Sequence, residues 1–143
     1  SEIFRKLVLK EQKAQFLNGN FGLSRDPYLL SIVGRILNEE DVEYVKEEVY
    51  KTIEKFKTEL CDEQMLKNTK SNMKYGFLMG METAQNVAFS LIQPIINTGG
   101  IDALEDYYKT LDSVTAEDLK AAAQKYLVES GRTTVVVVQK GGK

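Results

Sequence analysis

The clearest pattern in the chain is a set of apolar residues that recur every three or four positions. They are Val42, Val45, Val49, Ile53 and Phe56. This spacing places them on one face of an α-helix, and most charged residues of the segment fall on the opposite face. Acidic residues at 39–41 precede the run, and acids favour the N-terminal end of a helix because of its dipole. The pattern therefore predicts an amphipathic helix that begins near Val42.

Related periodic patterns predict further helices along the chain. They cover Ser1–Ala14, Asp62–Tyr75, Met81–Ile96, Ile101–Leu111 and Thr115–Leu127. The last of these opens with Thr115-x-x-Asp118, which has the spacing of a capping box. In a capping box the two end residues satisfy each other's backbone N–H groups, so this motif fixes where the helix starts.

Glycine and proline mark the expected ends of these helices. Gly76 and Gly80 are expected to interrupt the helical stretch that follows Asp62. Pro94 should kink or end the next stretch, because it lacks a backbone N–H, and Gly99–Gly100 should close it. Gly131 fits the position just past the end of the last helix.

Three segments have the composition of β-strands. Gln15–Leu23 contains turn formers at 18–20, which predict a broken or edge strand. Tyr28–Leu37 is the best candidate for a central strand, although Gly34 indicates a bulge or close packing. Thr133–Gln139 is uniformly apolar after its two threonines, which is typical of a strand buried on both faces.

The order of elements is a helix, two strands, a run of helices and a last strand. This order predicts an α+β fold, with a mixed or antiparallel sheet packed against several helices. Arg25–Asp26–Pro27 is expected to form the turn between the first two strands. We expect one domain over residues 1–139 and a flexible tail over residues 140–143.

Composition limits the classes of partner. The chain has 143 residues, of which 43% are hydrophobic and 28% charged, as in ordinary globular domains. Its net charge of −2 provides no basic surface for nucleic acid. No apolar run approaches the ~20 residues that span a bilayer, and no secretory signal precedes the first helix. Because the chain opens with Ser1 and not with Met, we expect an excised or processed part of a longer protein.

The chain contains no histidine. This absence removes the H-x-x-E-H and H-E-x-x-H zinc sites, the Ser-His-Asp triad and the Cys-His dyad from this chain. Catalysis by this chain would therefore use lysine, tyrosine or carboxylates, unless the chemistry lies on another polypeptide segment.

Ser71-x-x-Lys74 has the spacing of serine acyl-enzymes. No S-D-N or K-T-G motif accompanies it, and Ser71 lies in the polar stretch 68–72. A solvated helix face is the preferred interpretation.

Three acidic clusters offer carboxylate pairs or oxygen ligands for a metal. They are Glu39–Asp41, Asp102 with Glu105 and Asp106, and Glu117–Asp118. Each lies at a predicted helix start, where acids are favoured without any ligand, and none has EF-hand spacing. We interpret all three as helix-capping residues.

Cys61 is the single cysteine, so an internal disulfide is excluded. No histidine is available to activate its thiol, and a half-buried, unreactive thiol is the preferred interpretation. One cysteine suits either the cytosol or the periplasm, so the compartment stays open.

Two further sets of residues allow a binding role. Methionines with two phenylalanines could line a peptide groove, but their helical spacing favours core packing. They are Met65, Met73, Met79, Met81, Phe77 and Phe89. Arg25 and Arg35 could bind a peptide carboxylate, and solvation or a structural ion pair is the default for both.

Five strings along the chain share a recognisable order. They are Ser1–Val8 (SEIFRKLV), Asp26–Ile32 (DPYLLSI), Glu82–Ala88 (ETAQNVA), Leu111–Leu119 (LDSVTAEDL) with Ala122, Ala123, Tyr126 and Leu127, and Arg132–Val138 (RTTVVVV). These strings resemble those of the pitrilysin/insulinase zinc metallopeptidases, which include the mitochondrial processing peptidases. Together and in order they cover nearly the whole chain, which resembles a C-terminal domain of the family without its first strand and helix.

The resemblance implies a clamshell of repeated α+β domains around a chamber. Zinc and the catalytic Glu would lie on an N-terminal domain, in the same chain or a sister subunit, and this chain would enclose and contact the peptide substrate. Many family members carry an Arg and a Tyr, seven residues apart, that stabilise the substrate; the matching positions here are Val8 and Gln15. A catalytically inactive family member with a structural role, or a partner subunit, is therefore the alternative.

For the chain alone we expect no catalytic and no metal-binding residues, and no membrane or nucleic-acid partner. An excised domain would expose surface that its sister domain normally covers, which favours homodimers. In a bacterium the compartment would be the cytoplasm or the periplasm.

Overall fold

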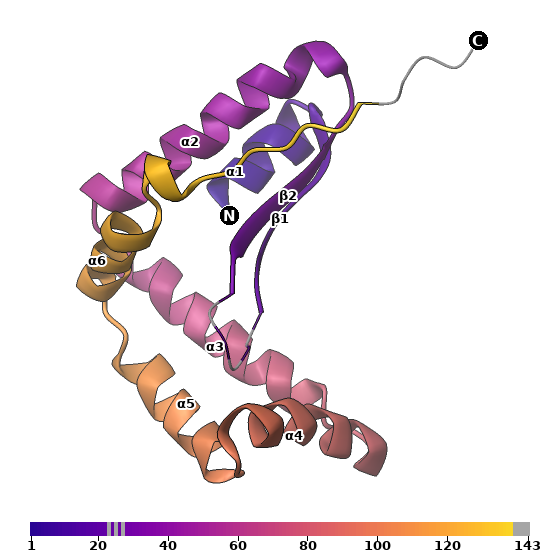
Figure 1. The fold of residues 1–143 in the computed structure, drawn as a ribbon, viewed down its shortest axis with the longest axis vertical. Coiled ribbons are helices and arrows are strands. Elements are labelled where there is room, and N and C mark those ends of the chain that lie inside the picture. The colour runs from indigo at the N-terminus through magenta and orange to yellow at the C-terminus, as the bar shows by residue number, and fades with distance from the viewer. Residues whose placement is uncertain (23, 25, 27, 139–143) are drawn as a thin grey trace. The chain divides into compact units, whose positions relative to one another are not determined.

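The computed structural model describes residues 1–22, 24, 26 and 28–138. These residues form α-helices and a two-stranded antiparallel sheet, which confirms the predicted α+β class (Figure 1). They divide into two units. Unit 1 contains Ser1–Asn20, Ser31–Glu59 and the described residues from Lys120 onward, and unit 2 contains the described residues of Phe21–Leu30 and Leu60–Leu119. The single domain over 1–139 stays a prediction, and the tail at 140–143 lies outside the described residues.

The N-terminal helix of unit 1 is shorter than the sequence predicts. Helix α1 (Glu2–Phe4) continues into the π-helical segment η1 (Arg5–Lys10), where the N–H of Glu11 donates to the carbonyl of Lys6 at 2.9 Å. The predicted end at Ala14 is wrong. Gln12 has a left-handed φ of 51°, which breaks the helix, and Ala14 is already the first residue of a strand.

Strands β1 (Ala14–Phe21) and β2 (Leu30–Ile36) pair with each other. The prediction of a broken or edge strand is confirmed in its second form, because β1 continues through the turn formers at 18–20 and is an edge strand. The expected central position of β2 is wrong for the described residues, since each strand of a two-stranded sheet is an edge strand. Close packing at Gly34 is confirmed, because a Cβ there would lie 3.0 Å from Leu17 Cδ1. Arg25 and Pro27 of the predicted turn lie outside the described residues.

Helix α2 (Val42–Thr58) confirms the strongest periodic pattern. It follows the 3₁₀ turn η2 (Glu39–Asp41) and lies beside α1. The buried side chains of unit 1 include Leu7, Ala14 and Val45, one each from η1, β1 and α2. Together with Ala123 of α6 (Ala116–Tyr126), which is also buried, they form the apolar core of the unit.

Ion pairs hold the N-terminal segment to the start and the middle of α2. Lys6 Nζ lies 2.5 Å from a carboxylate oxygen of Glu48, and Lys13 donates to Asp41. Asp41 also accepts from the side-chain amide of Asn38 at 3.4 Å. The hydrogen bond from Lys13 lowers the pKa of Asp41 more than any other interaction, although burial opposes the shift.

The lowered pKa of Asp41 predicts a specific loss of stability in acid. Its contribution should be complete above the ordinary carboxyl pKa of 3.8 and disappear as the pH falls through the lower folded-state value. We expect Asp41→Asn to reduce stability at pH 7 and to weaken this acid-side decline. The check is the urea midpoint of both proteins at pH 7 and pH 3. Glu40→Gln, in the same turn but exposed, is the matched control; equal declines in Asp41→Asn and the unmodified chain would contradict the prediction.

Helix α6 (Ala116–Tyr126) is followed by the 3₁₀ turn η3 (Glu129–Gly131). Within unit 1, Lys120 Nζ and Gln124 Nε2 donate to the carbonyls of Thr58 and Lys57, at 2.7 and 2.8 Å. They therefore satisfy backbone carbonyls at the end of α2, which its own helix leaves without partners. Gly131 lies inside η3, so its predicted place directly after the helix is wrong.

The predicted buried strand at Thr133–Gln139 is wrong for residues 133–138, and Gln139 lies outside the described residues. Residues 132–138 form no strand, and Val135 and Val137 are 76% and 89% exposed. The segment is held at its beginning, where Thr134 shares a hydrogen bond of 2.8 Å with the Tyr50 hydroxyl and Arg132 lies 3.9 Å from the Tyr50 ring centroid. A uniformly apolar strand requires neighbours on both faces, and the described residues do not supply them.

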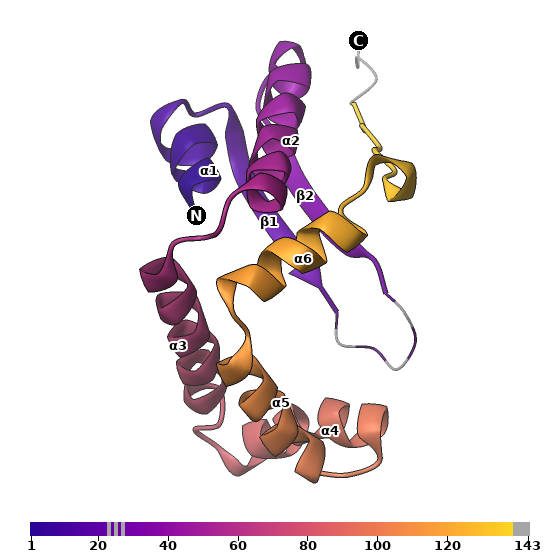
Figure 2. The same cartoon turned by 90° about the vertical axis from the view of Figure 1, so that its left-hand side faces the viewer.

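Unit 2 is built from α3 (Glu63–Met79), α4 (Ala84–Thr98) and α5 (Asp102–Ser113), which Figure 2 shows in a second orientation. The expectation that Gly76 interrupts the helix is wrong, because Gly76 lies inside α3. Pro94 lies inside α4 and does not end it, and a kink at Pro94 stays a prediction. Gly80 ends α3, in the position of its C-cap. Gly99 ends α4 with a left-handed φ of 84°, which confirms the predicted closure.

Two lysines one turn apart join α3 to the end of α5. Lys70 Nζ donates to the carbonyls of Asp112 and Val114 at 2.7 and 2.5 Å. Lys74 Nζ lies 2.5 Å from the Asp112 carboxylate. Cations are favourable at a helix C-terminus, where carbonyls lack partners within the helix, so these contacts stabilise the pairing of the two helices.

The prediction that the methionines and phenylalanines pack in the core is wrong for four of these residues. Met65, Met73, Met79 and Phe89 are exposed, by 39% to 70%. Helical spacing identified the helices but not which of their faces is covered.

In the described part of the chain, no single helix is long and apolar enough to cross a membrane; α4 and α5 meet the length and composition test only together, with an 88° bend between them.

Candidate functional site

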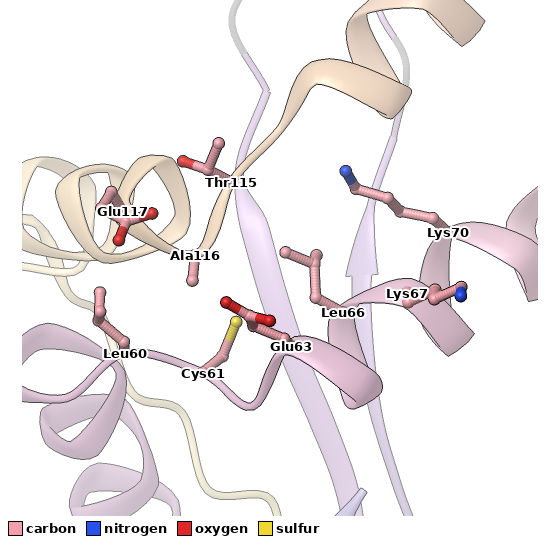
Figure 3. Close-up of a pocket in the computed structure, with 9 residues that line it drawn as sticks. All are labelled: Leu60, Cys61, Glu63, Leu66, Lys67, Lys70, Thr115, Ala116 and Glu117. Carbon is pink, nitrogen blue, oxygen red and sulfur yellow. The ribbon is translucent and has the colours of Figure 1, made fainter.

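The candidate site is a pocket in unit 2, where the start of α3 approaches the start of α6 (Figure 3). It has a volume of about 560 Å³, within the range of small-molecule and side-chain pockets. Its lining residues are Leu60, Cys61, Glu63, Leu66, Lys67, Lys70, Thr115, Ala116 and Glu117.

Helix caps position both walls of the pocket. On the α3 side, the Asp62 carboxylate accepts the backbone N–H of Met65 at 2.7 Å. On the α6 side, the Thr115 hydroxyl accepts the N–H of Asp118 at 3.1 Å, and the Asp118 carboxylate accepts the N–H of Thr115 at 2.9 Å. This reciprocal pair confirms the predicted capping box. The backbone and side-chain bonds from Thr115 lower the pKa of Asp118.

We expect Thr115→Ala to cost about 1 kcal/mol of stability, because the first turn of α6 loses its side-chain cap. Thr115→Ser keeps a hydroxyl, so it should retain most of the stability that the cap contributes. Urea denaturation followed by far-UV circular dichroism compares the three proteins. Equal midpoints for the alanine variant and the unmodified chain would show that the cap contributes nothing.

The charges around the pocket are only partly neutralised. The Lys70 ammonium group donates to backbone carbonyls, whereas the side chains of Glu63, Lys67 and Glu117 have no hydrogen bond or ion pair among the described residues. In Figure 3, Cys61 and Glu63 point toward Ala116, and Lys67 points away from it. The lining thus combines apolar side chains with a thiol and a carboxylate, and it has no general base of the histidine type.

The residues do not fit a zinc site. Protein zinc sites use three or four Cys, His, Asp or Glu ligands, and the described residues contain no group of three that could hold a metal ion. Histidine is absent from the whole sequence.

Ser71 and Lys74 do not form a nucleophile and base. Lys74 is paired with the Asp112 carboxylate, and no hydrogen bond joins Ser71 to Lys74 in the described part of the chain. The interpretation of this spacing as part of an ordinary helix surface is supported, because the ammonium group has a structural partner in α5.

The three acidic clusters lie at helix starts, as predicted. They form η2, the first turn of α5 with Asp106 just beyond it, and the first turn of α6. The capping interpretation is confirmed for Asp118 and wrong for the other two clusters, because neither α2 nor α5 begins with a side-chain cap bond. Glu105 pairs with Lys109 at 2.9 Å on the surface of α5.

Cys61 is a half-buried free thiol, as expected, but its place in a pocket wall was not foreseen.

The two positions that match the family's substrate-stabilising pair lie in unit 1. Val8 is half-buried in η1, and Gln15 is exposed in β1. Arg35 is exposed in β2, and Arg25 lies outside the described residues. None of these positions belongs to the lining of the pocket.

Sequence reasoning missed the role of Lys70, which both lines the pocket and binds the end of α5. Its partners are 42 and 44 residues away in the sequence, so no local pattern could reveal them. The local signal in the sequence was the Thr115-x-x-Asp118 capping box, which marks the start of α6.

No protein-family model matches the chain, and no curated protein sequence matches it. Among solved structures, the chain is similar to a protease from Helicobacter pylori, with a TM-score of 0.80 and 21% sequence identity over 92% of this chain. The similarity covers 32% of the protease chain, so this chain spans about a third of that protein's length. At this identity the comparison shows the fold: the chain has the α+β fold found in one part of that protease.

Proposed function

We propose that this chain is a non-catalytic domain of a zinc-dependent metalloendopeptidase of the pitrilysin/insulinase type, which encloses and contacts the peptide substrate. The observation that carries the proposal is the fold similarity to a protease over 92% of the chain. The ordered strings that resemble this family support the same assignment.

The division of labour follows from the residues that the chain lacks. Zinc peptidases of the H-x-x-E-H type bind the metal through two histidines and a further carboxylate, and this sequence has no histidine. Zinc and the Glu that activates water would therefore lie on an N-terminal domain, in the same chain or a sister subunit. The coverage of only 32% of the neighbour's chain leaves room for such a domain.

A structural or interaction domain of a catalytically inactive relative is the second candidate. The observation that favours it is the identity of Val8 and Gln15. An apolar valine cannot donate a hydrogen bond to a substrate carbonyl, and a glutamine amide replaces a phenol. A family member with Val8 and Gln15 would have lost the substrate-stabilising Arg and Tyr, or it would act beside a catalytically active partner.

The test compares this chain alone with the complete parent protein. We expect the chain alone to hold no stoichiometric zinc and to leave a quenched fluorescent peptide uncut. The complete protein, or the chain mixed with its catalytic partner, should bind zinc and cut the peptide, and a chelator should abolish the cleavage. Zinc analysis and the fluorescence assay measure both properties.

The outcomes separate the two candidates. A complete protein that contains no zinc and cuts no peptide favours the structural role. Stoichiometric zinc on the isolated chain, together with chelator-sensitive hydrolysis, would overturn both. The matched control replaces the Glu of H-x-x-E-H in the catalytic part by Gln, which should remove cleavage while this chain is unchanged.

A further inference from the structure

We draw no further inference here: the strongest candidate, the exposed valine run Val135–Val138 that follows η3 in unit 1, carries no proposal because nothing in the structure shows what covers it.

Discussion

Replacing Leu7 by Ala should destabilise unit 1 by about 2–5 kcal/mol. Leu7 is completely buried, at 0% exposure, and lies in η1, which continues α1, the helix that contacts α2. Truncation removes apolar contacts and leaves a cavity, because surrounding side chains relax only in part. Unit 1 has few other buried apolar residues, so the remaining core contacts compensate little for those that the substitution removes. Hydrogen exchange of the α2 amides measures the effect within this unit.

Leu9→Ala is the matched control for Leu7→Ala. It removes the same atoms from the same helical segment, but Leu9 is 60% exposed. We expect its effect to stay within about 0.5 kcal/mol, as for most surface substitutions. Equal exchange rates in the two variants would mean that η1 does not contribute to the core of unit 1.

Gly34→Val should destabilise the sheet, although valine is a better strand former than glycine. The new Cβ would lie 3.0 Å from Leu17 Cδ1 and 3.3 Å from the carbonyl oxygen of Phe16. The leucine can rotate away, but the backbone carbonyl belongs to the paired strand and cannot. Overpacking costs about 1–3 kcal/mol, whereas the gain in strand propensity is at most about 1 kcal/mol. Urea denaturation should show a lower midpoint.

Gly19→Val provides the comparison on the other strand. No atom lies within 4 Å of the Cβ position at Gly19, so valine there meets no obstacle. We expect this variant to match or exceed the unmodified chain in stability by up to about 1 kcal/mol. If both glycine variants were equally stable, the close approach of the strands at Gly34 would be disproved.

The candidate site illustrates the difference between local and distant information. The cap at Thr115 follows from a short motif, because a cap is a bond between residues three positions apart, whereas the Asp62 cap at the start of α3 is seen only in the structure. The pocket that these two helix starts border follows from no motif. It depends on the contacts of Lys70 with carbonyls more than 40 residues away, which only the folded chain brings together.

The exposed faces are where the sequence predicts least. Val135–Val138 and the methionines of α3 look like core residues by composition, yet they are exposed in the structure. An apolar residue indicates that burial would be favourable, but burial needs a partner surface.

The sequence by itself determined the α+β class, the helix beginning at Val42, the start of α6 and the end of α4 at Gly99. These features depend on periodicity, caps and backbone preference within a few residues. The absence of histidine likewise needs no structure to exclude histidine-based chemistry from this chain. Only the tertiary structure decided where the first helix ends, which glycines interrupt helices and which apolar residues are covered. Those outcomes depend on contacts between distant segments, whose free energy outweighs local preference.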